Sequence, residues 1–324
     1  MTTKFAITFA GQGSQSIGMM AGFTDQSGAI VKRTFDEASE SINTDLWAMV
    51  VHGPADALAQ TVNTQPVMLA AGIATFRAWC ALGGRTADFY AGHSLGEYTA
   101  LVAAGAISFA DAVPLVRFRA EAMQAAVPEG LGGIAAILGL EVEVIREICI
   151  EASESEVCEA VNLNSPGQIV IAGHKTAVER GMALAKARGA KRAILLPMSV
   201  PSHCALMKPA AEKLAQYLQN ISVIVPAMPV IQNADVQAFD SAAAIKQALV
   251  EQLYRPVRWI ETIQQLAAYG SQHVVECVPG KILTGLNKRI DATLNCMAIY
   301  DSASLKAAVL ELETSASRVE AKTE

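Results

Sequence analysis

The sequence predicts an α/β fold in which a mostly parallel sheet is covered by helices and a smaller βαββαβ unit is inserted. Short apolar segments alternate with helical segments in residues 1–128 and 198–324, and this alternation favours a parallel sheet covered on both faces. Between them, residues 129–197 follow the order strand, helix, strand, strand, helix, strand, which is the ferredoxin-like pattern. We therefore expect a core of residues 1–128 and 198–324 and an inserted subdomain of residues 129–197.

The first part of the core is expected to supply two strands, over 4–10 and 88–92. Helices are predicted over 31–41, 64–82 and 95–106, and a fourth begins after Ser108. Thr64 is the expected N-cap of the second helix, with Pro66 in its first turn. Ser108 is followed three residues later by Asp111, which resembles a capping box.

In the inserted subdomain, two helices (141–152 and 176–188) are expected among four strands, over 133–138, 157–162, 168–172 and 192–196. The loop NLNSPG is expected to join the second and third strands. After Pro197, helices are predicted over 205–218, 243–253 and 259–268, and strands over 228–232, 273–278 and 295–299. The tail after Thr314 is small and polar, so we expect it to fray.

Composition excludes several classes of function. The chain has 324 residues, of which 52% are hydrophobic, and its net charge of −6 argues against general nucleic-acid binding. The apolar run at the N-terminus is too short for a signal peptide, and the uncharged run 57–76 contains too many polar residues to span a membrane. Six cysteines without CxxC spacing suggest reduced thiols, and His203–Cys204 has no companions at zinc spacing. We expect a cytoplasmic monomer that binds neither metal nor membrane.

Residues 92–96, GHSLG, fit the pattern GxSxG between a predicted strand and a predicted helix. In such a nucleophile elbow the chain turns so sharply that the serine projects from the sheet edge, and the glycines avoid Cβ clashes. The helix that follows directs its N-terminal N–H groups at an oxyanion. Ser94 is therefore the predicted nucleophile of a hydrolase-like core, and it would form a covalent acyl-serine.

A serine of ordinary pKa needs a base. Among the five histidines, His203 is the best candidate because it follows a predicted strand, in SVPSHC, and a loop at a strand end could reach the elbow. The alternative is a loop histidine with satisfied hydrogen bonds. His93 adjoins Ser94, but neighbouring side chains diverge at such a turn, so we expect it to be structural.

Seven short motifs are spread along nearly the whole chain. They are FAGQGSQ (9–15), TQP (64–66), GHSLGEY (92–98), RAEAMQ (119–124), NLNSPGQIVIAG (162–173), PSHCALM (201–207) and QLYRPVRW (252–259). Together they resemble the malonyl-CoA:acyl carrier protein transacylases of bacterial type II fatty acid synthesis. The resemblance implies transfer of malonyl from malonyl-CoA to the phosphopantetheine thiol of acyl carrier protein, by ping-pong catalysis through a malonyl-serine. It implies no resident cofactor, because both thioesters are substrates.

The resemblance also implies a role for each matched residue. Ser94 would carry the acyl group, His203 would be its general base, and the main-chain carbonyl of Gln252 would orient the histidine. The backbone N–H groups of Gln12 and Leu95 would form the oxyanion hole. Arg119, the arginine followed at the right interval by Met123-Gln124, would grip the malonyl carboxylate, and the substrate site would also include Met123, Asn162 and Gln168.

Two positions depart from the family pattern. Ala10 stands where the family usually has proline before GQGSQ, and Val278 replaces the first glycine of the usual GPG before Lys281. Both positions put the local loop shape in doubt and not the chemistry.

Two other functions fit part of the sequence. A serine esterase or thioesterase would share the elbow and the base, but it would need neither Arg119 nor the inserted unit. A catalytically idle module that binds carrier protein would not need Ser94, His203, Arg119 and Gln12 all intact.

Acyl carrier proteins are small and acidic, and this chain is itself net negative, so a local basic patch is expected at the docking site. The densest basic cluster is Lys186, Arg188, Lys191 and Arg192. The competing interpretation is a solvated face that complements the C-terminus of a helix.

Overall fold

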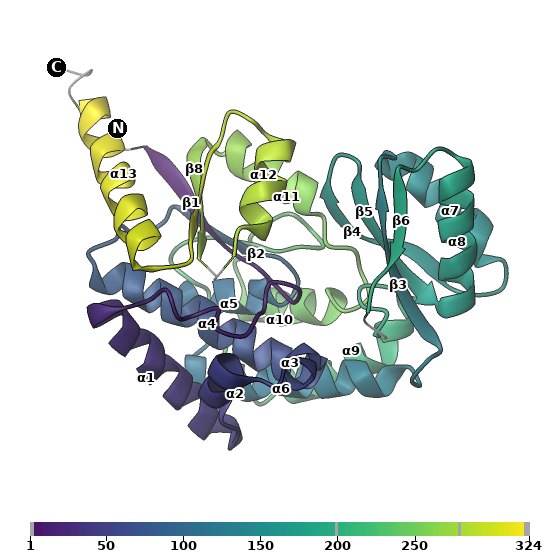
Figure 1. The fold of residues 1–324 in the computed structure, drawn as a ribbon, viewed down its shortest axis with the longest axis horizontal. Coiled ribbons are helices and arrows are strands. Elements are labelled where there is room, and N and C mark those ends of the chain that lie inside the picture. Colours follow the sequence, from purple (N-terminus) through teal and green to yellow (C-terminus); the bar gives the residue numbers. More distant parts are fainter. Residues whose placement is uncertain (1–2, 198–199, 278–279, 321–324) are drawn as a thin grey trace.

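The computed structural model describes residues 3–197, 200–277 and 280–320, the last five of these as backbone only. Its larger sheet has five strands in the order β7-β2-β1-β8-β9, and every neighbouring pair is parallel (Figure 1). The strands are β1 (Lys4–Phe9), β2 (Phe89–Gly92), β7 (Val230–Ile231), β8 (Ser271–Cys277) and β9 (Asn295–Ile299). The predicted parallel sheet is confirmed.

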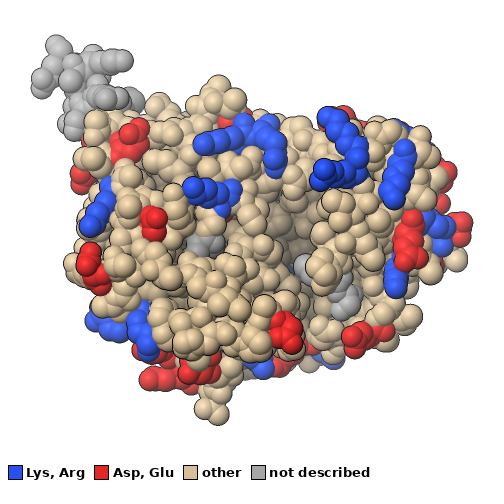
Figure 2. Space-filling model, viewed as in Figure 1, with Lys and Arg blue, Asp and Glu red and all other residues tan. Residues whose placement is uncertain are grey.

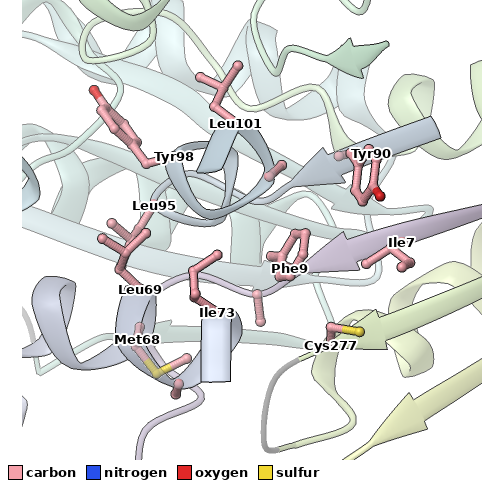
Figure 3. Packing of buried hydrophobic residues seen from close by; sticks show 14 of the residues in the cluster. Ile7, Phe9, Met68, Leu69, Ile73, Tyr90, Leu95, Tyr98, Leu101 and Cys277 are labelled. Carbon is pink, nitrogen blue, oxygen red and sulfur yellow. The ribbon is translucent and has the colours of Figure 1, made fainter. Parts of the chain in front are cut away.

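Helices cover both faces of this sheet. α1 (Asp25–Ile42), α4 (Thr61–Ala81) and α6 (Phe109–Ala126) lie on one side, and α11 (Trp259–Ala268) and α12 (Ile282–Ile290) lie on the other (Figure 1). The apolar side chains of α4 surround the whole helix, as expected for a buried one. Figure 3 shows Leu69 and Ile73 of α4 near Phe9 of β1 and near Leu95, so the core lies directly under the predicted elbow.

The remaining helices complete the core. They are α2 (Leu46–His52), α3 (Ala55–Ala59), α5 (Gly96–Ala103), α9 (Lys208–Leu218), α10 (Ala242–Glu251), α13 (Ser302–Glu320) and a short 3₁₀ helix over Ala205–Met207. Sequence patterns did not predict α2, α3 or α12. Within the described residues, no helix combines the length and the apolar character that crossing a bilayer requires.

Two local predictions about helix ends are wrong. α4 begins at Thr61 and not at Thr64, because the carbonyl of Gln60 already accepts hydrogen bonds from the N–H groups of Asn63 and Thr64. The tail after Thr314, which we expected to fray, is helical as far as Glu320, and the rest of it (321–324) lies outside the described residues. Buried Leu305 and Leu312 anchor α13, and the Thr314 hydroxyl donates to the carbonyl of Leu310. At Ser108 the predicted cap is confirmed, because its Oγ accepts from the N–H of Asp111 at 3.0 Å.

A second sheet has four antiparallel strands in the order β4-β5-β3-β6. These are β3 (Gly132–Leu138), β4 (Cys158–Ser165), β5 (Gln168–His174) and β6 (Arg192–Leu195), with α7 (Val142–Ser153) and α8 (Lys175–Ala187) packed together beside them (Figure 1). This is the predicted ferredoxin-like order. The expected loop NLNSPG is shorter than predicted, because Asn162 to Ser165 belong to β4. The domain limits at 128/129 and 197/198 stay predictions.

The small sheet joins the core through β4. The N–H of Leu163 donates to the carbonyl of Val257, and the N–H of Val257 donates to the carbonyl of Val161. This junction leaves a cavity of about 430 Å³, lined by strand residues of the small sheet and, on the core side, by the loops that follow β1 and β2 and by helices. Figure 2 shows the hollow between the two parts of the molecule.

Candidate active site

The elbow lies between β2 and α5, as the sequence predicts. Ser94 has φ +54°, in the left-handed region that non-glycine residues rarely adopt. A Cβ atom at Gly92 would lie 1.9 Å from the carbonyl carbon of Gly96, and one at Gly96 would lie 2.0 Å from the carbonyl oxygen of Phe9. Any side chain at either position would collide with the backbone, and the turn can be this tight because both residues are glycine.

Asn233, just after β7, holds this strained turn from behind, and sequence analysis missed it. Its Oδ1 accepts from the N–H of Ser94 at 2.7 Å, and its Nδ2 donates to the carbonyl of Gly92 at 2.6 Å. The N–H of Asn233 in turn donates to the carboxyl of Glu97, whose pKa is raised by burial to about 8. These bonds offset a backbone strain of about 1–3 kcal/mol at Ser94.

His203 contacts Ser94 directly. Its Nε2 lies 2.8 Å from Ser94 Oγ, and its Nδ1 lies 2.7 Å from the main-chain carbonyl of Gln252. A carbonyl only accepts, so Nδ1 carries the proton and Nε2 is left to accept from the serine hydroxyl. Burial, and next the Arg119 guanidinium, lower the pKa of His203 to about 3, which keeps the imidazole neutral.

Arg119 of α6 is buried in the same site, with 1% of its surface exposed. One terminal nitrogen (Nη1) donates to Gln65 Oε1 at 2.7 Å, and the other (Nη2) donates to Gln252 Oε1 at 3.0 Å and lies 3.5 Å from Ser94 Oγ. Arg117 lies elsewhere, in an ion pair with Glu121. Of the two arginines, only Arg119 lines the cavity.

The other predicted site residues also line this cavity: Gln12, Leu95, Met123, Asn162 and Gln168. The backbone N–H groups of Gln12 and Leu95 have no acceptor among the described residues. Asn162 Oδ1 is buried without a described partner, whereas Gln168 Oε1 accepts from Arg289 of α12 at 2.7 Å.

His93 takes no part in the contact between Ser94 and His203. Its Nε2 lies 2.8 Å from Asn164 Oδ1, and its ring packs against Trp259. Of the two departures from the family pattern, Ala10 is buried, and Val278 lies outside the described residues. Among the residues that the structure describes, no three His, Cys, Asp or Glu side chains are grouped as a metal site would need.

Gln65, Asn164 and Asn233 belong to the site, although the sequence analysis gave them no role. Gln65 and Asn164 stand inside the motifs TQP and NLNSPGQIVIAG, and Asn233 follows the end of a parallel strand. A polar residue at the carboxyl end of a parallel strand is the signal that could have found Asn233.

Comparison with known proteins is consistent with this geometry. Residues 7–292 match the acyl transferase domain family. The chain is 53% identical over 309 residues to the malonyl CoA-acyl carrier protein transacylase of Salmonella typhimurium, covering 95% of this chain and 100% of the relative. It is 45% identical over 312 residues to the protein of that name from Bacillus subtilis, covering 96% of this chain and 98% of the relative.

Several solved structures are similar over nearly their full length, including the two that follow. The acyl-carrier-protein S-malonyltransferase of Burkholderia pseudomallei has a TM-score of 0.92 at 54% identity, covering 94% of this chain and 99% of the other. A malonyl-transacylase solved in complex with its type II PKS acyl-carrier protein has a TM-score of 0.93 at 50% identity. The match covers 95% of this chain and 100% of the transacylase.

Proposed function

Because this chain belongs to the malonyl CoA-acyl carrier protein transacylase family of acyltransferases, we propose that it carries malonyl from malonyl-CoA to acyl carrier protein on Ser94, by a ping-pong mechanism. The observation that carries the proposal is the buried Arg119 guanidinium 3.5 Å from Ser94 Oγ. A cation buried there suits an acyl group that ends in a carboxylate, since its planar fork can bind both carboxylate oxygens.

In the first half-reaction, Ser94 Oγ attacks the thioester carbonyl carbon while His203 Nε2 takes the hydroxyl proton. The oxyanion lies on the backbone N–H groups of Gln12 and Leu95, and one such donor typically contributes about 3–4 kcal/mol in the transition state. The C–S bond then breaks, and His203 returns the proton to the coenzyme A thiolate. The products are malonyl-Ser94 and free coenzyme A.

In the second half-reaction the phosphopantetheine thiol of carrier protein gives its proton to His203 and attacks the malonyl-serine carbonyl. Collapse of the intermediate breaks the ester C–O bond, and His203 returns the proton to Ser94 Oγ. The coenzyme A leaving group of the first half-reaction and the phosphopantetheine nucleophile of the second are thiols with pKa values of about 8.5, so these two groups demand less of the base than an alcohol or an amine would. No cofactor is required. We place the reaction in the cytoplasm, where the six free cysteines would stay reduced.

Intact-mass measurement tests the proposal. Incubation with malonyl-CoA should add one malonyl group, mapped to Ser94, and holo carrier protein should then remove it. An adduct that decays in water equally fast with or without carrier protein would favour a hydrolase. Absence of any adduct would favour an idle binding module. Acetyl-CoA and methylmalonyl-CoA run in parallel define the acyl range.

Replacing Arg119 with alanine should invert acyl selectivity. Malonyl would lose its buried partner, which costs about 3–5 kcal/mol, whereas acetyl would no longer meet an unpaired cation. Arg119→Lys should fall between wild type and alanine, because one point charge does not reproduce the fork. Acylation rates with malonyl-CoA and acetyl-CoA give the ratio. Arg117→Ala is the control on the same helix, and a wild-type ratio in Arg119→Ala would refute the role.

We further propose that carrier protein docks on the α8–β6 basic cluster, which comprises Lys186, Arg188, Lys191 and Arg192. All four are exposed, although Arg188 is paired with Glu147 and Glu151 of α7. The cationic character therefore rests on the other three, for which no ion pair occurs among the described residues. Figure 2 shows Lys and Arg on both sides of the hollow, over α12 and over the strands of the small sheet.

Reversing Lys186 and Lys191 to glutamate should raise the KM for carrier protein several-fold at low salt and weaken its salt dependence. Acylation by malonyl-CoA should change much less, so each half-reaction is measured separately across a salt series. Lys213→Glu with Lys306→Glu changes the net charge equally on α9 and α13 and serves as the control. Wild-type behaviour of the Lys186/Lys191 variant toward carrier protein would move the docking site elsewhere.

A further inference from the structure

Gln252 contributes a side chain to the site as well as its main-chain carbonyl. The residue is 1% exposed. Its Nε2 donates to the carbonyl of Ser94 at 2.9 Å, and its Oε1 accepts from Arg119 Nη2 at 3.0 Å. One amide therefore joins the backbone of the elbow to the guanidinium, and the main-chain carbonyl of the same residue orients His203.

The acceptors around Arg119 share one property, which is that they are neutral. They are the amide oxygens of Gln65 and Gln252 and the hydroxyl of Ser94. A buried arginine is normally paired with a carboxylate, yet no carboxylate of the described chain forms an ion pair with this one. The nearby acid is Glu97, and burial raises its pKa to about 8, so it is mostly uncharged at neutral pH.

Arginine has five N–H donors in a rigid fork. The hydrogen bonds to Gln65, Gln252 and Ser94 use three of these donors, so two N–H groups of the guanidinium remain. One of them is Nε–H, which is buried and has no hydrogen-bond partner among the described residues. The guanidinium is thus fixed in place, but neither its charge nor all of its donors are consumed.

We propose that the side-chain amide of Gln252 is a specificity-positioning group, a neutral acceptor that fixes Arg119 beside Ser94 while leaving its charge for a carboxylate on the acyl group. This inference rests on the proposed malonyl transfer. A carboxylate at position 252 would hold the guanidinium equally well, but it would be a permanent counter-ion. The substrate carboxylate would then enter against a like charge, and its advantage over acetyl would disappear.

The test compares Gln252→Glu with Gln252→Met. The control is Gln247→Glu, on the exposed side of α10, the helix that ends just before Gln252. Both variants at 252 lose the donor to the Ser94 carbonyl. Glutamate keeps an acceptor for Arg119 and adds a charge, whereas methionine removes the acceptor and adds no charge, so the added charge is recognised by a larger fall in Gln252→Glu than in Gln252→Met. In Gln252→Glu we expect the malonyl-to-acetyl ratio of acylation rates to fall about 10- to 100-fold, as expected for an unfavourable charge pair. In Gln252→Met the ratio should fall less, because Arg119 keeps its charge but loses one support. The Gln247→Glu control should retain the wild-type ratio.

A pH profile with acetyl-CoA supplies a readout that loss of packing would not move. Burial, then the Arg119 guanidinium and the neighbouring His93, lower the pKa of His203. A carboxylate at position 252 offsets part of the positive charge of Arg119, so the pKa of His203 rises. As the pH is lowered, His203 is then protonated sooner, and the acylation rate begins to fall at a higher pH. The acid limb of Gln252→Glu should therefore lie above that of Gln252→Met.

The outcomes separate this inference from the proposed function. If wild type forms no malonyl adduct, the proposed function fails. If wild type prefers malonyl but Gln252→Glu keeps the wild-type ratio and acid limb, only the inference is overturned. If Gln252→Glu does not fold, Gln252→Met decides, because an unchanged ratio there shows that Arg119 does not need the amide.

Discussion

Ser94→Ala will form no malonyl adduct under conditions in which the wild type is fully acylated. The variant removes the one hydroxyl whose oxygen lies 2.8 Å from His203 Nε2, and no other side chain of the described residues has this contact. The fold should survive, because Asn233 holds the elbow through main-chain groups of Gly92 and Ser94 that alanine retains. The loss is therefore chemical and complete, which makes it the largest effect expected of any single substitution.

Intact mass after incubation with malonyl-CoA measures the adduct, and circular dichroism with thermal unfolding checks the fold. Ser14→Ala is the matched control, since Ser14 lines the same cavity from the loop after β1. It should be acylated like the wild type. A malonyl adduct on another residue of the wild-type protein would overturn the assignment of Ser94.

The elbow could be predicted from the sequence because its causes are local. Gly92 is required by its close approach to Gly96 within the turn, and the pattern stands between a strand and a helix that both follow from apolar periodicity. Gly96 is the exception, because the atom it must avoid is the carbonyl oxygen of Phe9 on the neighbouring strand. The order of the inserted unit could be predicted because its causes are local too. The loop between its second and third strands is shorter than predicted. Asn162 and Asn164 are polar, as loop residues usually are, but they belong to the end of a strand that faces the active site.

The selection of Arg119 over Arg117 lies beyond local patterns. Two residues apart on a helix, their side chains point about 200° from each other, so periodicity separates them but does not say which one faces the cavity. The resemblance to a family supplied that choice. The supports of Arg119 were not predictable at all, because Gln65 and Gln252 lie 54 and 133 positions away in the sequence. Asn233 is 139 positions from the serine that it holds.

His203→Ala will slow acylation by malonyl-CoA by about 10²- to 10⁴-fold, the usual cost of losing a positioned general base. His93→Ala is the control, because His93 bonds Asn164 and not Ser94 Oγ. His93→Ala should lower the melting temperature and leave the rate of acylation by malonyl-CoA close to that of the wild type. Acylation of the His203 variant at the wild-type rate near neutral pH would place the base elsewhere.

The pH dependence of the wild type gives the same residue a second test. His203 acts as a base only when neutral, and burial together with Arg119 lowers its pKa to about 3. Its active form therefore persists on acidification well below the pH near 6.5 at which an ordinary histidine becomes protonated. We expect kcat/KM for acylation, which reports the free enzyme, to stay level between about pH 5 and 8. A limb near pH 6.5 would contradict the buried, neutral imidazole.

Bound malonyl should strengthen this base. Its carboxylate neutralises the Arg119 guanidinium, which removes one of the causes that depress the pKa of His203. Acetyl leaves the cation uncompensated, so the imidazolium that forms during attack stays beside an unpaired positive charge. In single-turnover experiments at saturation, the acid limb for malonyl-CoA should therefore lie at higher pH than the limb for acetyl-CoA, and Arg119→Ala should abolish the difference. Equal limbs for the two substrates in the wild type would show that Arg119 acts on binding alone and not on the base.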